Sequence, residues 1–192
     1  MKNAKWITLT AISLSLIALD ATAGQTKSLK WRDIVGIVEA GNLVGRGDLG
    51  TGTDGIIGGA PWSTLGGNAK VDPDSGRIQF QVRGLVLAAG SNAAFALAGL
   101  PIGTPDGVTD VMGTLVCNVD GTADGSGTST IVNTPSVHLS STGDAQFNGK
   151  VGAIPDVCTT DPNPNNVAFL IRIFDPVGFR GVWIANGAVL DR

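Results

Sequence analysis

Two cysteines, one histidine and a set of aspartates are the residues whose types could do chemistry in this chain. Cys117 and Cys158 are the only cysteines. A catalytic dithiol usually has the spacing CxxC, whereas two cysteines far apart in an exported chain are typical of a structural disulfide. We therefore predict a Cys117–Cys158 disulfide, which stabilises the fold by about 4 kcal/mol in the chain-entropy model.

His138 is the only histidine and the one side chain with an ordinary pKa near neutrality. It lies between Val137 and Leu139 in a segment with strand-like alternation, and no GxSxG elbow accompanies it. The sequence lacks the second histidine or free cysteine that a transition-metal site would need. We interpret His138 as a surface or hydrogen-bonded strand residue. A secreted hydrolase that uses Asp residues with His138 is the alternative.

The most unusual stretch runs from Gly45 to Gly67, with the sequence GRGDLGTGTDGIIGGAPWSTLGG. It contains the GxGxxG of dinucleotide-binding folds, but the following IIGGAP cannot open the helix that such a site needs. It also resembles one turn of a calcium-binding nonapeptide repeat around Asp54, and it includes the integrin-recognition tripeptide that ends at Asp48. We interpret the stretch as a long glycine-rich surface loop, in which Asp48, Asp54 and Trp62 could contact a ligand or partner.

A second oxygen-rich segment, NVDGTADGSG, holds Asn118, Asp120 and Asp124. Its spacing resembles a calcium loop, but it lacks the glutamate that completes an EF-hand, and the surrounding pattern is not helical. Asp54, Asp120 and Asp124 are therefore weak calcium candidates, and a calcium-dependent adhesive module is a further alternative. We predict no resident metal and no cofactor.

Aromatic residues are scarce, with 4 tryptophans and no tyrosine. This shortage weakens a carbohydrate-binding interpretation, because sugar-binding sites often display aromatic faces. Trp62, which follows Gly59-Ala60-Pro61, is the best candidate for an exposed aromatic contact. Packing in the core at a sheet edge is an equal alternative for this residue.

Period-two alternation predicts the elements that position these residues. In the segment Asn68 to Leu87, Ile78, Phe80 and Val82 alternate with polar residues after the turn sequence DPDSG, which indicates a hairpin with one buried and one wet face. The segment Ser136 to Val151 predicts a second hairpin. The similarity of GRIQFQV to GDAQFNGKV is interpreted as two hairpins that obey the same rules rather than as an internal repeat.

The remaining pattern predicts an all-β chain. Other expected strands are Trp31 to Glu39, Val111 to Val119, Thr128 to Val132, Val167 to Phe174 and Gly181 to Ala185, and the segment Ala88 to Leu100 is ambiguous between a short helix and a loop. The 28 glycines and the near absence of glutamate favour turns over helices. We predict an antiparallel β-sandwich or small barrel.

The first 23 residues have the pattern of a secretory signal peptide. Lys2 and Lys5 form a positive region, the apolar segment from Ile7 to Leu19 follows, and Ala21-Thr22-Ala23 is the expected cleavage site. We therefore expect residues 24–192 to form a single β-sandwich domain that is secreted or periplasmic. The formal net charge of −3 gives no indication of a nucleic-acid partner, and no segment predicts membrane insertion.

The sequence resembles a group of small exported bacterial β-domain proteins that carry one disulfide and have no known activity. The resembling segments are Pro61-Trp62, AKVDPDSGRIQFQVRGLVL, TLVCNV, VHLSSTGDAQFNGKV, Cys158 and GVWIANGAV. The resemblance implies an exported β-domain with a disulfide and supplies no active site. We expect a non-catalytic binding or structural module, able to assemble with itself or with another exported protein on the cell surface or outside the cell.

Overall fold

The computed structural model of the chain describes residues 27–49, 54–88, 102–105, 107–160, 166–174 and 181–191. The predicted signal peptide lies outside the described residues, and so does the ambiguous segment 88–100 except for Ala88. In the described ranges, no helix has both the length and the apolar character that a membrane span requires.

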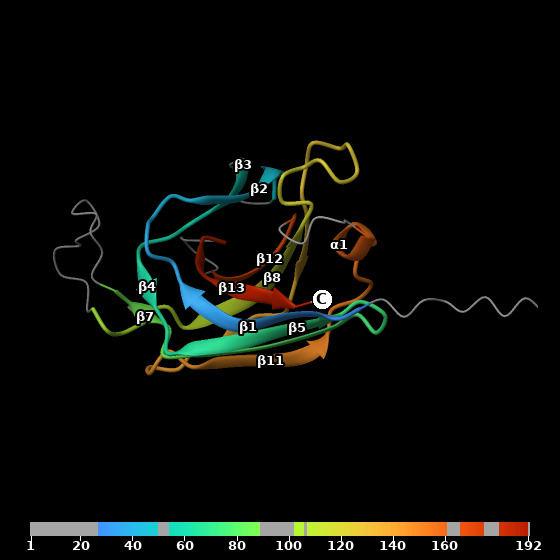
Figure 1. Cartoon of the computed structure of the whole chain (residues 1–192). Coiled ribbons are helices and arrows are strands. Elements are labelled where there is room, and N and C mark those ends of the chain that lie inside the picture. The colour runs from blue at the N-terminus through green and yellow to red at the C-terminus, as the bar shows by residue number, and fades with distance from the viewer. Residues whose placement is uncertain are drawn as a thin grey trace, which may run out of the picture.

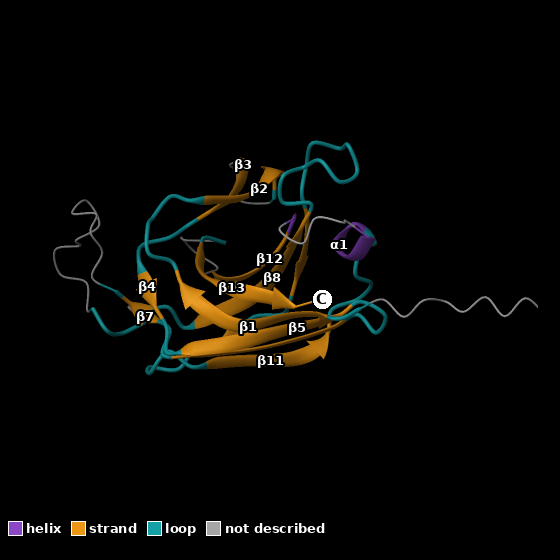
Figure 2. Cartoon of the chain, viewed as in Figure 1, coloured by secondary structure: helices purple, strands orange, loops and turns teal. Residues whose placement is uncertain are grey.

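The described residues are almost entirely β-structure, which confirms the predicted all-β class (Figure 2). The strands are β1 (Leu29–Gly36), β2 (Leu43–Asp48), β3 (Asp54–Ile57), β4 (Trp62–Ser63), β5 (Gly66–Asp72), β6 (Arg77–Arg83), β7 (Val86–Leu87), β8 (Asp110–Cys117), β9 (Thr130–Asn133), β10 (Val137–His138), β11 (Ala145–Lys150), β12 (Val167–Ile173) and β13 (Trp183–Asp191). One helical turn, α1 (Val157–Thr160), completes the described elements.

Nine of these strands form one antiparallel sheet in the order β10-β8-β12-β13-β1-β5-β6-β11, with β9 paired to β8 beside this path. The sheet curls into a half-barrel, in which β1, β5 and β11 form one wall while β8 and β12 lie behind it (Figure 1). Two small sheets, β2-β3 and β4-β7, lie at other sides of the half-barrel. The architecture is therefore consistent with the predicted sandwich or small barrel.

The first predicted hairpin is confirmed as β5 and β6, which pair from Gly66 opposite Arg83 to Asp72 opposite Arg77. The buried positions of β6 are the apolar ones that alternation predicts. In the turn, the Asp72 carboxylate accepts a hydrogen bond from the Ser75 backbone N–H. Hydrogen bonds from Ser75 lower the pKa of Asp72. Because the folded-state pKa is lowered, the turn keeps this support above the ordinary aspartate pKa and loses it as the pH falls through the lowered pKa and the carboxylate is protonated.

The second predicted hairpin is wrong in its pairing. The chain does reverse as expected, because the Ser140 N–H donates to the Asp144 carbonyl oxygen at 3.0 Å. The flanking strands nevertheless pair elsewhere: β10 pairs with β8, and β11 pairs with β6. The physical reason is the curl of the sheet, which brings its first and last strands to either side of one short turn. Local alternation predicts the turn but cannot show that its two arms close a barrel-like sheet.

The stretch Gly45 to Gly67 is not one long loop, so the surface loop interpreted from its glycine-rich sequence is wrong. Its described residues include the end of β2, all of β3, and β4. Gly45 and Gly47 have φ angles of 83° and 81°, and the β2-β3 register shifts between Val44 and Asp48. Glycine adopts this left-handed conformation without steric cost, so a strand of irregular twist forms where the composition suggests a loop.

The other predicted strands are confirmed with shifted ends. They correspond to β1, β8, β9, β12 and β13. The largest difference is at β13, which continues to Asp191 instead of ending at Ala185. Pairing with β1 explains the extension, because Lys30 lies opposite Asp191 and Trp31 opposite Leu190. Tertiary pairing here outweighs the weak alternation of the segment.

Four aromatic rings line the inside of the curled sheet. Phe169 on β12 lies 5.5 Å from Trp31 on β1 and 5.9 Å from Phe80 on β6, measured between ring centroids. Phe80 in turn stacks on Phe147 of β11 at 6.1 Å. Each such pair contributes about 0.5–1.5 kcal/mol beyond the area that it buries. The rings therefore join strands from opposite walls of the half-barrel into one core.

Gly113 on β8 leaves space for these rings because it has no side chain. A Cβ on Gly113 would lie 2.7 Å from Cζ of Phe169 and 2.9 Å from Cδ1 of Phe80. We therefore expect Gly113→Ala to lower the free energy of unfolding by about 1–3 kcal/mol through overpacking. Combining it with Phe169→Leu should cost less than the sum of the two single changes, because the smaller side chain leaves space for the methyl group. Urea unfolding of the four proteins measures this coupling, and strict additivity would contradict the packing role.

The predicted disulfide is present between Cys117 at the end of β8 and Cys158 in α1. Both half-cystines are fully buried. The bond ties the strand Val111 to Val119 to the segment before Val167, as the sequence predicts. The helical turn in that segment is not predicted.

The disulfide closes a loop with a sequence separation of 41 residues. We expect the double change Cys117→Ser and Cys158→Ser to lower the free energy of unfolding by about 4 kcal/mol, because the denatured chain regains the entropy of the open loop. Guanidinium unfolding of the variant and of the oxidised wild type measures the difference. Equal unfolding midpoints for the two proteins would show that the bond has no stabilising role.

Candidate functional site

Two adjoining hollows lie on the strands β6 and β11. One has a volume of about 470 Å³, and the other, of about 500 Å³, reaches β10. They share the lining residues Gln81 and Gln146 and so adjoin each other. We name the first hollow, together with this shared end, the amide trough and define it by five of its lining residues: Asn68, Gln79, Gln81, Gln146 and Asn148.

Strand register places these amides in rows. Gln81 on β6 lies opposite Asn68 of β5 on one side and opposite Gln146 of β11 on the other. Gln79 lies opposite Asn148. Alternation turns the intervening Phe80 and Phe147 toward the core, so that only polar side chains face outward along this part of the sheet.

The amides have few partners within the protein. In the described part of the chain, no hydrogen bond joins the side chains of Gln79, Gln81 or Gln146 to another residue, and Asn148 accepts one from Nε of Arg77 at 2.8 Å. Each free amide offers two donors and one acceptor oxygen. The trough therefore presents a dense set of groups that can hydrogen-bond a ligand.

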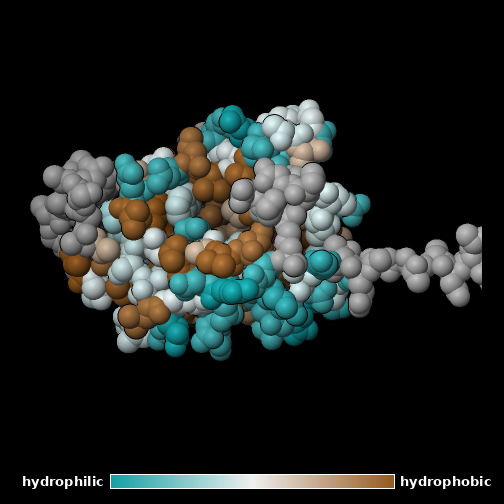
Figure 3. Space-filling model, in the orientation of Figure 1, coloured by the Kyte–Doolittle hydropathy of each residue, from teal (hydrophilic) through white to brown (hydrophobic). Residues whose placement is uncertain are grey.

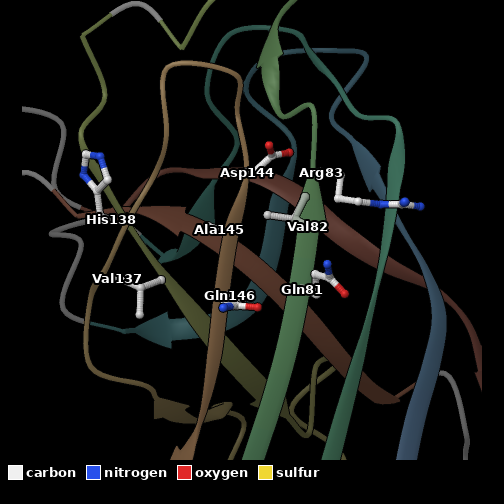
Figure 4. Close-up of a pocket in the computed structure, with 8 residues that line it drawn as sticks. All are labelled: Gln81, Val82, Arg83, Val137, His138, Asp144, Ala145 and Gln146. Atoms are coloured by element: carbon white, nitrogen blue, oxygen red, sulfur yellow. The ribbon is translucent and has the colours of Figure 1, made fainter.

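His138 lies at the end of the trough, across from Gln81 and Gln146 (Figure 4). Asp144 lines the same end, but its carboxylate accepts hydrogen bonds from the Gly84 N–H at 3.0 Å and from Oγ1 of Thr142 at 2.9 Å. Among the described residues, no hydrogen bond joins His138 to a carboxylate, and the imidazole is exposed. The histidine alternative thus lacks the base-to-acid contact on which a triad depends.

A third hollow, of about 360 Å³, brings two of the calcium candidates together. Asp54 of β3 and Asp120 of the loop after β8 line it, together with Arg46. The Asp54 carboxylate accepts a hydrogen bond from the Gly47 N–H. The Asp120 carboxylate accepts both the N–H and the hydroxyl of Thr122, and these bonds lower its pKa. Within the described ranges, no three acidic, histidine or cysteine side chains are grouped to hold a metal ion.

Asn118 organises the segment that holds the other calcium candidate. It is 0% exposed and has a φ of 56°, a left-handed conformation that asparagine tolerates better than most residues. Its Nδ2 donates to Oδ1 of Asp124 at 2.8 Å and to the Thr128 carbonyl oxygen at 2.9 Å, while its Oδ1 accepts from the Ala123 N–H. The pKa of Asp124 is lowered, first by the hydroxyl of Ser126. The oxygen-rich spacing is explained by these internal bonds.

Two substitutions of Asn118 distinguish the contribution of its side-chain hydrogen bonds from that of its left-handed backbone conformation. We expect Asn118→Ala to lower the free energy of unfolding by about 2–4 kcal/mol, because it removes buried hydrogen bonds and places a less tolerant residue at positive φ. Asn118→Gly should cost about 1 kcal/mol less, since glycine adopts the same φ freely but offers no side-chain bonds. Thermal and urea unfolding measure both variants. Equal losses would show that the backbone conformation has no part in the effect.

The structure places the other predicted contact residues apart from the trough. Trp62 on β4 is only 4% exposed and belongs to the core, which is the second of the two interpretations that the sequence leaves open. Asp48, at the end of β2, is exposed and lies opposite Asp54 in the β2-β3 register. The glycine-rich stretch therefore supplies a carboxylate pair at one end of the molecule, and Trp62 serves packing.

Sequence reasoning missed the trough itself. The alternation that predicts β6 also assigns Gln79, Gln81 and Arg83 to the wet face. The similarity of GRIQFQV to GDAQFNGKV could have revealed the rest, because these two segments are neighbouring strands with Phe80 opposite Phe147. Alternation alone cannot show which strands pair. It therefore cannot show that the solvent-exposed faces of β6 and β11 form one surface.

Comparison with known proteins identifies no relatives. The chain matches no protein-family model, no curated protein sequence and no solved structure.

Proposed function

We propose that this protein is an exported, non-catalytic binding module whose ligand lies in the amide trough. The observation that carries the proposal is the row of outward amides, Gln79, Gln81 and Gln146, with no hydrogen-bond partners in the described residues. Buried polar side chains are usually hydrogen-bonded within the protein, and exposed ones bond to water, which a ligand can replace. Here they are aligned in register along the open trough, which suits the recognition of a polar, extended ligand.

The position of the trough supports binding by a rigid surface. Its side chains project from β5, β6 and β11, and the inward residues of the same strands pack in the aromatic core. Side chains on strands whose opposite face is packed hold their spacing better than side chains on loops. A ligand that hydrogen-bonds these amides would meet a surface that needs little reorganisation.

Removing two central amides tests the proposal. We expect Gln81→Ala combined with Gln146→Ala to weaken ligand binding by about tenfold or more, since two hydrogen-bonding groups are lost. The free energy of unfolding should change by less than about 0.5 kcal/mol, because both side chains are exposed. The measurement is a titration of ¹⁵N-labelled protein with three probes: a neutral dextran, an oligogalacturonate and a polyglutamate peptide.

Binding in the trough should perturb the backbone amides of β6 and β11 with at least one of these probes. Ser63→Ala is the matched control, because Ser63 is exposed on β4, away from the trough, and should leave affinity unchanged. A panel in which no probe perturbs β6 or β11 would contradict the proposed function. The same conclusion would follow if the double variant bound as tightly as the wild type.

A further inference from the structure

Four cations gather at the end of the amide trough that is remote from His138. They are Lys30 on β1, Lys70 on β5, Arg77 on β6 and Lys150 on β11, and all four are exposed. We name this group the cationic end. Figure 3 shows hydrophilic residues along the lower part of the molecule, where Figure 1 places β5 and β11. The chain as a whole has a formal net charge of −3, so this positive surface is local and runs against the overall charge.

Strand register sets these cations directly against each other. Lys30 lies opposite Lys70, and Arg77 lies opposite Lys150. Like charges at directly opposite positions of an antiparallel pair destabilise a sheet. Each of these two pairs therefore carries a repulsion that an anion bound between them would relieve.

Two carboxylates offset part of this repulsion. Asp191 on β13 lies opposite Lys30, although it also pairs with Arg32. Asp72 lies opposite Arg77 and interacts electrostatically with Lys70, while its carboxylate is hydrogen-bonded to Ser75 in the turn. In the part of the chain that the structure describes, the one salt bridge joins Arg32 to Asp191, and none involves the cationic end. The Arg77 guanidinium donates instead to the neutral amide of Asn148. One carboxylate, Asp144, lines the hollow at the opposite end of the trough, together with Arg83.

The trough continues from this cationic end as a neutral, hydrogen-bonding surface. From Arg77 to Arg83 along β6 the distance is about 20 Å at the usual rise per residue. Over this length the outward side chains are Gln79 and Gln81. Gln81 has amide neighbours on both sides, Asn68 and Gln146, whereas Gln79 lies between Asn148 and the cation Lys70. Amides suit hydroxyl groups, because each offers both donors and an acceptor. The surface thus pairs anion binding at one end with hydroxyl binding along the rest.

Other anionic partners match this surface less well. The aromatics of these strands, Phe80 and Phe147, pack inward, so the face has no platform on which the bases of a single-stranded nucleic acid could stack. It equally lacks the aromatic face that sugar-binding sites often display, so recognition of a polysaccharide here would depend on charge and amide hydrogen bonds. A membrane surface would need exposed apolar anchors, and none of the large exposed apolar side chains of the described residues lies on β5, β6 or β11. An acidic peptide in extended form would pair through its backbone with the edge strand β11, and would then lie beside the row of cations and amides rather than across it.

We propose that the amide trough binds an extended anionic polysaccharide, with its acidic groups between the opposed cations Lys30–Lys70 and Arg77–Lys150 and its hydroxyl groups on the amides. This inference rests on the proposed function, since it names the ligand class of the same trough. It also assigns a role to the repulsion in the sheet. The cationic end sacrifices stability in the free protein for affinity toward the polyanion.

Opposite effects on stability and affinity test this assignment. We expect Lys70→Gln and Lys150→Gln, made singly, to raise the melting temperature of the free protein, because each removes a like-charge contact. The same variants should bind oligogalacturonate about threefold to tenfold more weakly in calorimetric titrations, and the wild-type affinity should fall between 20 mM and 200 mM salt. Arg46→Gln is the matched control: it removes one exposed positive charge at β2 and should change neither quantity in this way.

Failure of the polyanion assignment and failure of the proposed function give different experimental results. Equal wild-type affinity for oligogalacturonate and neutral dextran, with binding to both lost in the Gln81→Ala and Gln146→Ala variant, would overturn the polyanion assignment and leave the proposed function standing. Tighter binding of duplex DNA, polyglutamate or phosphatidylglycerol vesicles than of oligogalacturonate would also overturn it. A melting temperature that falls in Lys70→Gln and Lys150→Gln would show that these cations stabilise the sheet, which contradicts the inference. Failure of every probe to reach β6 and β11 would contradict the proposed function itself.

Discussion

The packing of Phe169 inside the curled sheet is the interaction on which the rest of the structure depends. Its ring contacts Trp31 and Phe80, which lie on strands from the opposite wall, and Gly113 beneath it has no side chain to keep the ring away. A flat sheet could not bring β12 against β6, because three strands separate them in the pairing order. Curling is therefore the condition for a common core, and the aromatic contacts stabilise the curled form.

The curl has a direct consequence for the outer surface. It turns β6 and β11 so that their apolar residues meet the core and their amides face outward together. It also brings β10 to the far side of the short turn before β11, which encloses one end of the trough with Val137 and His138. The inner aromatic pair of Phe80 with Phe147 and the outer amide pair of Gln81 with Gln146 belong to the same two strands. Core packing and the outward row of amides are thus set by one register.

Local patterns in the sequence predict most of the strands, the first hairpin and the disulfide, because alternation and cysteine count depend only on neighbouring residues or on compartment. They do not predict the partner of β11, since the turn at Ser140–Asp144 looks the same whether its arms pair or diverge. They also misjudge the segment from Gly45, where left-handed glycines form an irregular strand. The trough is missed for the same reason as the pairing, because its amides come from three strands that only the fold brings together.

The trough has two features that a surface selected only for stability would avoid, namely like-charge pairs and unpartnered amides. These features favour a binding role over a structural one. A sheet selected only for stability would give each cation acidic neighbours alone. Lys30 and Arg77 each have one, Asp191 and Asp72, but each also lies opposite a second cation, Lys70 or Lys150. Such a sheet would also satisfy or dilute its amides, yet Gln79 and Gln81 extend along one face without partners among the described residues. Departures from local consistency are expected at functional sites, where they are compensated by packing elsewhere. In this chain the compensation lies directly behind the trough, because the strands that carry the repelling charges and free amides are those that the aromatic core and the long β1-β13 pairing hold in place.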